Sequence, residues 1–147
     1  MPASETSSTT PAPIAATASS TAPSSDSGGS RGFSTHQFSR HFNGNSVHFL
    51  VLRMESSFFL WVGSQSGCLK NLSVAMSTAF EKAPTACSLM GDASDLTSSA
   101  LAAKLTKRTG GCQVFVSYNV PATDAATVNF VHESIVEEMS LKPDKFY

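Results

Sequence analysis

The chain has 147 residues and a formal net charge of −1, which suits a single domain with one modest hydrophobic core. A charge this close to zero argues against a nucleic-acid partner, whose phosphates require a basic surface. It argues equally against a polybasic membrane anchor, and no apolar run approaches the roughly 20 residues of a membrane-spanning helix. We therefore expect no nucleic acid and no membrane among the partners of this chain.

The N-terminal segment, residues 1–32, consists almost entirely of Ser, Thr, Ala, Pro and Gly. Such a composition offers almost no apolar surface to offset the entropy lost on ordering, so we predict a disordered tail. The segment lacks the basic and apolar regions of a secretory signal, and it has too few Arg residues for a transit peptide. The three cysteines are odd in number and widely spaced, unlike a secreted disulfide framework. We expect a cytoplasmic protein, with the nucleus as a second location.

The remaining residues, 33–147, are predicted to form one domain that begins with five strands. Asn43-Gly44 is a strong signal for a tight turn between the first two strands, and Glu55-Ser56 turns the second strand into the third. The five predicted strands are Thr35–Phe42, Val47–Met54, Ser57–Gly63, Leu69–Ala79 and Pro84–Met90.

A helix, a strand and a second helix follow. Ser94-Asp95 is predicted to cap the first helix, and Gly110-Gly111 ends it. Its predicted apolar stripe consists of Leu96, Leu101 and Leu105, with Ala100 beside it. Residues 112–119 form the sixth strand.

The second helix is predicted to start after Pro121, with Thr123 or Asp124 as its cap. Its predicted buried face carries Val128, Val131, Ile135 and Met139, and its other side carries Glu133, Glu137 and Glu138. The order β-β-β-β-β-α-β-α predicts an α+β fold, a six-stranded antiparallel sheet with two helices.

The hairpin of the second and third strands has two apolar faces. A two-residue turn at Glu55-Ser56 places Leu50 opposite Trp61, and alternation then sorts the side chains. One face carries Val47, Phe49, Val51, Phe58, Leu60 and Val62, and the other carries His48, Leu50, Leu52, Met54, Phe59 and Trp61.

An antiparallel sheet normally has one apolar and one wet face, and two helices of this length cover only one. The second apolar face is then typical of an interaction site. Two alternatives stay open: the helices lie on opposite faces, or the sheet folds over itself. The His48 face mixes aliphatic side chains with aromatic anchors that carry a polar group, so we predict that it is the partner interface.

No catalytic, cofactor-binding or metal-binding residues are predicted. The Gly63–Gly67 loop has Gln65 at its centre, so it does not match the G-x-S-x-G nucleophile motif. The histidines show no paired spacing, and none of Cys68, Cys87 and Cys112 belongs to a C-x-x-C zinc motif. Asp92 and Asp95 could form an acid/base pair, but helix capping explains them better. For His48, packing or interface contact is a better interpretation than a catalytic base, since no nucleophile is nearby in sequence.

Several ordered runs resemble those of the proteasome assembly chaperone 4 family. They are VHFLVLRMESSFFLWVG, LKNLSVAM, SLMGDASDLTSSALAAKLTKRTGG, QVFVSYN and TDAATVNFVHESIVEEM. The resemblance covers about residues 33–147. This chain departs from the family in its long N-terminal extension, in the Gly110-Gly111-Cys112 connection and in its final Tyr147.

The resemblance implies a non-enzymatic chaperone that pairs with proteasome assembly chaperone 3. The heterodimer would promote formation of the alpha ring of the 20S core particle, engage the alpha-5 subunit and leave as beta subunits are added. The family fold is a six-stranded antiparallel sheet with helices, through which the two chaperones associate. No compact binding motif transfers residue by residue, so the predicted interface depends on patterning alone.

Two other functional classes stay open, namely a different small α+β adaptor or scaffold subunit in an obligate dimer, and a small hydrolase. The ending Phe146-Tyr147 resembles the start of a hydrophobic-Tyr-any-residue signature, with which some proteasome-binding proteins insert between alpha subunits. It lacks the final residue, so we interpret it as an ordinary chain end.

Overall fold

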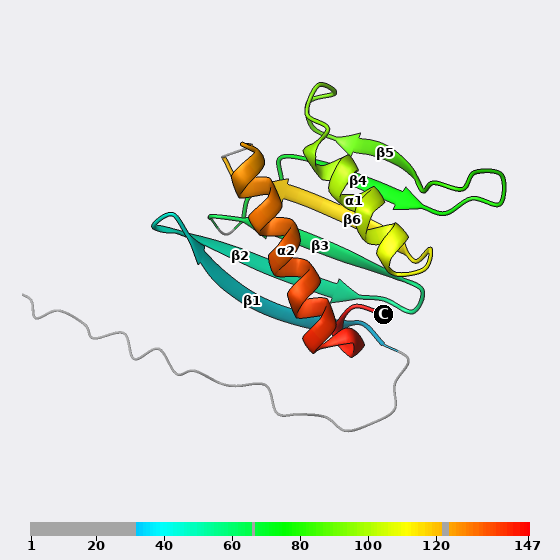
Figure 1. The fold of residues 1–147 in the computed structure, drawn as a ribbon, viewed down its shortest axis with the longest axis horizontal. Helices are drawn as coiled ribbons and strands as arrows, with labels where there is room; N and C mark the ends of the chain where they lie inside the picture. The colour runs from blue at the N-terminus through cyan, green and yellow to red at the C-terminus, as the bar shows by residue number, and fades with distance from the viewer. Residues whose placement is uncertain (1–31, 66, 122–123) are drawn as a thin grey trace, which may run out of the picture.

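The computed structural model describes residues 32–65, 67–121 and 124–147. The predicted tail, apart from Gly32, lies outside these residues, as does Thr123. The described elements are β1 (Ser34–Phe42), β2 (Asn45–Arg53), β3 (Ser57–Gly63), β4 (Leu72–Met76), β5 (Thr85–Met90), α1 (Thr97–Arg108), β6 (Gln113–Asn119), α2 (Ala125–Leu141) and the short 3₁₀ helix η1 (Pro143–Lys145). Their order confirms the predicted one (Figure 1). The fourth strand is shorter than the predicted Leu69–Ala79.

Two tight turns determine the register of the first three strands. Asn43 and Gly44 both have positive φ angles, 48° and 77°, as the turn typical of two-residue hairpins requires. At the second turn, the Met54 amide donates to the Ser57 carbonyl oxygen over 2.8 Å, so Glu55 and Ser56 are the two loop residues. The resulting pairing places Leu50 opposite Trp61, which confirms the predicted register.

The sheet is mixed, so the prediction of a purely antiparallel sheet is wrong. The strand order is β1-β2-β3-β6-β4-β5, and β3 pairs with β6 in parallel. The cause is the crossover through α1, which returns the chain across the sheet so that β6 runs in the same direction as β5. β6 then enters between β3 and β4, where it is antiparallel to β4 and parallel to β3.

Both helices lie on the same face of the sheet, α2 over β1–β3 and α1 over β6, β4 and β5 (Figure 1). The alternative with helices on opposite faces therefore does not occur. The hairpin face opposite the predicted interface is buried beneath the helices, and its six side chains are Val47, Phe49, Val51, Phe58, Leu60 and Val62. The rest of this core consists of Ala75 of β4, Val114, Val116 and Tyr118 of β6, Leu101, Ala102, Leu105, Val131, Ile135 and Met139 of the helices, and Phe146.

Helix α1 differs from the prediction at its start. Its N-cap position is Leu96, with no side-chain capping bond, although the Asp95 carboxylate accepts a hydrogen bond from the Thr97 amide over 3.0 Å. Leu96 is 66% exposed and Ala100 is also exposed, so neither belongs to the buried stripe. The reason is that Leu96 precedes the first helical turn, and that the buried positions Ser98, Leu101, Ala102, Leu105 and Thr106 define a different face.

Helix α2 begins as predicted at Asp124, whose carboxylate accepts a hydrogen bond from the Thr127 amide over 3.0 Å. Glu138, predicted on the polar side, is instead 3% exposed. Its carboxylate contacts His36 and Arg40 of β1, so the edge strand supplies the partners that permit its burial.

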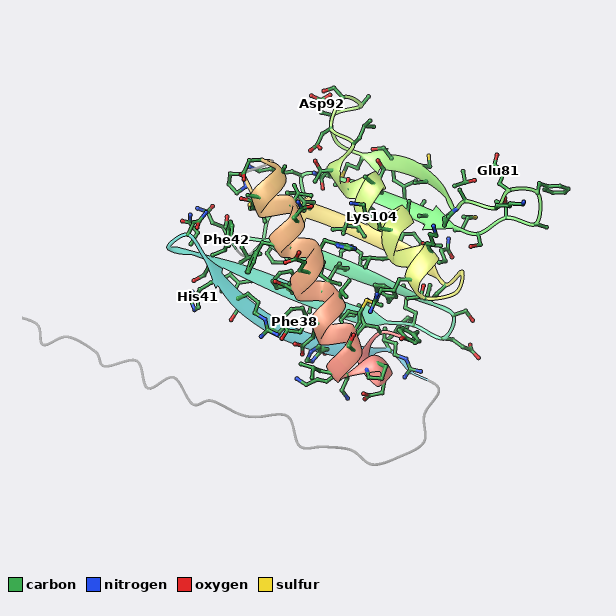
Figure 2. The ribbon with its side chains drawn as sticks, in the orientation of Figure 1. Phe38, His41, Phe42, Glu81, Asp92 and Lys104 are labelled. Carbon is green, nitrogen blue, oxygen red and sulfur yellow. The ribbon has the colours of Figure 1, made fainter. Side chains whose placement is uncertain are left out.

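A stacked pair of phenylalanines also holds α2 on β1, since the Phe42 and Phe130 ring centroids are 4.4 Å apart. Within the sheet, Phe38 stacks on Phe49 of β2 at the same distance. Phe38 and Phe42 belong to β1, whose side chains Figure 2 shows beside α2. None of the helices within the described residues is long and apolar enough to cross a membrane.

Candidate protein-interaction face

The six predicted interface residues lie together on the sheet face opposite the helices, which we call the open face. Leu50 and Leu52 of β2 are opposite Trp61 and Phe59 of β3. His48 is exposed, and the other five side chains, those of Leu50, Leu52, Met54, Phe59 and Trp61, are half-buried. An apolar surface of this kind, left uncovered by its own chain, is typical of an interaction site.

The open face extends beyond the β2–β3 hairpin, to residues that sequence reasoning missed. Phe115 of β6 is beside Phe59, and Val74 of β4 is opposite Phe115. Leu72 and Met76 are two positions before and after Val74 on the same strand, so alternation places them on the same face. The alternation in Gln113–Asn119 could have separated Phe115 from the core residues Val114 and Val116. Its neighbours on the sheet could not be predicted, because they depend on the crossover through α1.

The two edges of the open face differ in polarity. At the β1 edge, the exposed side chains are Thr35, Gln37, Ser39 and His41. At the β5 edge, Met90 is exposed and apolar, and it lies opposite Leu72 of β4. The apolar part of the open face therefore reaches from β2 to β5 and ends at a polar rim on β1.

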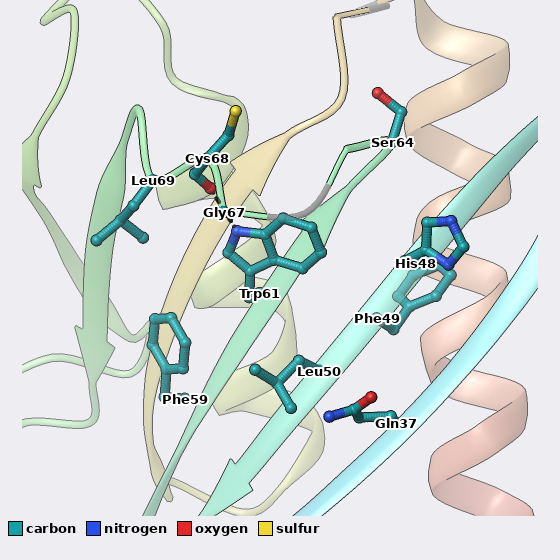
Figure 3. A pocket seen from close by; sticks show the side chains of 10 residues that line it. All are labelled: Gln37, His48, Phe49, Leu50, Phe59, Trp61, Ser64, Gly67, Cys68 and Leu69. Atoms are coloured by element: carbon teal, nitrogen blue, oxygen red, sulfur yellow. Dashed lines mark hydrogen bonds between the residues drawn. The ribbon is translucent and has the colours of Figure 1, made fainter. Parts of the chain in front are cut away.

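A hollow of about 870 Å³ lies on the open face beside Trp61. Leu50, Phe59 and Trp61 line it from the sheet, and Cys68 and Leu69 line it from the connection between β3 and β4 (Figure 3). The Trp61 indole Nε1 donates a hydrogen bond to the Cys68 carbonyl oxygen over 2.6 Å. A side chain at Gly63 would meet the indole ring, since a Cβ there comes within 2.5 Å of it. The indole is thus held at the edge of the hollow with its polar atom satisfied.

The β3–β4 connection passes the end of β6, and asparagine side chains attach it there. The Lys70 amide donates to Asn119 Oδ1 over 2.7 Å, and the Tyr118 amide donates to Asn71 Oδ1 over 2.8 Å. Ser117 Oγ donates to the Asn71 carbonyl oxygen over 2.6 Å. These bonds hold the wall of the hollow to the central strand of the sheet.

Asp92 and Asp95, considered as an acid/base pair, both accept hydrogen bonds from backbone amides, as capping residues do. Asp92 accepts hydrogen bonds from the amide and hydroxyl of Ser94, and the backbone bond is the main cause that lowers the pKa of Asp92. Burial raises the pKa of the Cys112 thiol, which disfavours the reactive thiolate. In the described part of the chain, no three His, Cys, Asp or Glu side chains are close enough together to hold a metal ion.

The chain is similar to known proteins both in sequence and in fold. The family model described as "Proteasome assembly chaperone 4" matches residues 46–120. Over 113 residues the chain is 45% identical to Proteasome assembly chaperone 4 from Homo sapiens, covering 77% of this chain and 90% of the human protein, and the figures are the same for Mus musculus.

A solved structure also resembles the fold. It is a chain of the structure titled "Crystal Structure of a Novel Chaperone Complex for Yeast 20S Proteasome Assembly", with a TM-score of 0.53 and 11% identity. The match covers 77% of this chain and 95% of that one. At this identity the likeness concerns the fold alone.

Proposed function

Because this chain belongs to the proteasome assembly chaperone 4 family, we propose that it promotes formation of the alpha ring of the 20S core particle as a heterodimer with proteasome assembly chaperone 3. In this proposal the chain acts by binding other proteins and catalyses no reaction. The human and mouse relatives carry the name of assembly chaperones, and the yeast structure with the same fold is a chaperone complex.

The observation that carries this proposal is the apolar open face. Its side chains from β2, β3, β6 and β4 have no helix over them, whereas the other face of the same strands is fully covered. Stable interfaces combine a central apolar area with aromatic anchors, and Phe59, Trp61 and Phe115 supply these anchors. We assign this face to the partner chaperone.

The clients of the heterodimer in this proposal are proteasome alpha subunits, alpha-5 above all, in the cytoplasm and also in the nucleus. A pull-down of the tagged chain followed by mass spectrometry tests the partners. Alpha-type proteasome subunits and a second small chaperone should dominate the captured proteins. A capture dominated by other adaptor or scaffold subunits would contradict the proposal.

A matched pair of neighbouring substitutions tests the face. Leu50→Asp places a carboxylate on the open face, and Val51→Asp places one in the core, where Val51 is completely buried. Leu50→Asp should stay folded by circular dichroism but weaken heterodimer formation by at least about 100-fold, because an unpaired carboxylate would be desolvated in the contact. Val51→Asp should unfold the chain. Size-exclusion chromatography with the partner measures the first effect. If the Leu50→Asp protein is folded and binds the partner as tightly as the wild-type chain does, the open face is not the interface.

A further inference from the structure

A groove separates the two helices on the side of the molecule opposite the open face. It has a volume of about 370 Å³ and is lined by residues between 96 and 104, at the start of α1 and within it, and between 125 and 132 in α2. On α1, the row Leu96, Ala100, Lys104 borders it at four-residue spacing. On α2, Val128 and His132 border it, also four residues apart. The groove is therefore apolar at one end and basic at the other.

The apolar end carries side chains that the fold of this chain does not use. Leu96 is 66% exposed, whereas Leu101 and Leu105 of the same helix are buried in the core. Ala100 is exposed, and Val128 is only partly covered. An exposed leucine beside an open groove provides apolar area for a partner to cover.

At the basic end, Lys104 lines the groove, and Arg108 lies near enough for its charge to act on His132. Among the described residues, Lys104, Lys107 and Arg108 form no ion pair, and the only side-chain hydrogen bond recorded for them joins Arg108 to Ser140 over 3.4 Å. Burial first, and then the charges of Lys104 and Arg108, lower the pKa of His132, while the nearby Glu133 opposes this. Positive charge thus prevails at this end.

Ordinary structural roles explain only part of this charge. Lys107 and Arg108 lie in the last turn of α1, where cations complement the helix dipole. Lys104, which Figure 2 labels, precedes that turn. The carboxylates at the other end of the groove, Asp95 and Asp124, already accept hydrogen bonds from the amides of the first helical turns.

We propose that this groove between α1 and α2 binds a short segment of another protein that carries an apolar side chain near an acidic one. The apolar side chain covers Leu96 and Ala100, and the acidic one pairs with Lys104 and Arg108. Four helical residues rise about 6 Å, so the two side chains are about 6–12 Å apart. That distance corresponds to one or two turns of a helical segment or two to four residues of an extended one.

The groove is independent of the open face, because the sheet lies between them. A protein bound to one therefore leaves the other accessible. The apolar half of the groove distinguishes this site from a simple anion site, since an anion alone would gain nothing from Leu96 and Ala100.

Selection of peptides on the purified full chain tests the proposal. Random dodecapeptides displayed on phage are selected on the wild-type chain and counter-selected on Ala100→Trp, whose indole fills the groove from an exposed helix position. The selected peptides should combine Asp or Glu with a large apolar residue within about eight positions, since about 12 Å of helix corresponds to about eight residues. Measured by fluorescence anisotropy, Lys104→Glu should weaken their binding at least about tenfold, and added salt should weaken it further.

Two controls make the result specific. Lys82→Glu makes the same charge change at an exposed lysine before β5, and it should leave peptide binding unchanged. Leu50→Asp on the open face should also leave it unchanged, which separates this site from the proposed chaperone interface. The proposal would be overturned if the selection yields no peptide that binds the wild-type chain and fails to bind the Ala100→Trp variant. Equal effects of Lys104→Glu and Lys82→Glu, or equal binding of a polyglutamate peptide, would overturn it too.

Discussion

Glu138 is the residue on which the contact between α2 and β1 is centred. Its carboxylate accepts hydrogen bonds from His36 Nε2 at 2.8 Å and Arg40 Nη2 at 3.1 Å, and the Lys142 ammonium is 3.0 Å away. Burial raises the pKa of Glu138, but the hydrogen bonds and charges of His36 and Lys142 outweigh it. The pKa therefore lies below its ordinary value of 4.5. The buried ion is compensated from two elements, and so it links them.

Glu138→Gln should lower the free energy of unfolding by about 2 kcal/mol at neutral pH, measured by urea denaturation. This is less than the roughly 3–5 kcal/mol of a fully buried pair, because Arg40 and Lys142 reach water. Glu137→Gln is the matched control, since Glu137 is exposed and 3.8 Å from Arg40. It should change stability by less than about 0.5 kcal/mol.

The pH dependence of the same variant gives a second measurement. A carboxyl group whose pKa is lowered by folding stabilises the fold fully above its unfolded value, near 4.5, and loses this contribution as the pH falls through the folded value. The stability difference between wild type and Glu138→Gln should thus shrink as the pH falls below about 4.5. A difference that grows below that pH would show that the carboxylate is not the stabilising form.

At the scale of elements, the short helix η1 returns the end of the chain to the core. Phe146 follows η1 and is completely buried, with its ring 5.7 Å from that of Phe58 in an edge-to-face arrangement and 6.4 Å from that of His36. Tyr147 is half exposed. The ring of Phe146 is part of the fold, so it is not available for insertion between other subunits.

Phe146→Ala should cost about 3–5 kcal/mol of unfolding free energy, because it removes a completely buried aromatic ring. Phe146→Leu keeps most of the apolar volume and should cost clearly less, which keeps the effect measurable if the alanine variant unfolds. Tyr147→Ala is the control and should change the midpoint of thermal unfolding very little. Equal effects at both positions would contradict the packing of Phe146.

At the scale of the whole molecule, the two sides of one sheet have different roles. The helices cover one side, and the other exposes an apolar area that spans β2 to β5 with a polar rim on β1. Phe115 lies at the middle of this area, between Phe59 and Val74. If a partner chaperone covers the open face, Phe115 should be close to the centre of the contact.

Phe115→Asp should leave the chain folded and weaken heterodimer formation by at least about 100-fold, because substitutions at the centre of an interface have the largest effects on binding. Thr35→Asp introduces the same carboxylate at the polar rim and should change binding by less than about threefold. Isothermal titration calorimetry with the partner compares the two. A larger effect at Thr35 would place the contact on the β1 edge instead.

The sequence by itself determined the local structure of this protein, because turns and alternation act over a few residues. Asn43-Gly44 and Glu55-Ser56 set the register of three strands, and that register separated the core face from the open face. The prediction that the open face meets a partner depends on the same pattern and stays a prediction.

Only the tertiary structure decided which elements lie side by side. The position of β6 between β3 and β4 made the sheet mixed and added Phe115 and Val74 to the open face. The burial of Glu138 depends on β1, which is about 100 residues away in sequence, since His36 and Arg40 are separated from it by 102 and 98 positions. Helical periodicity alone marks a glutamate as exposed. The physical reason is that long-range pairing follows from packing the whole chain, and no local pattern encodes the partner that a buried charge will meet.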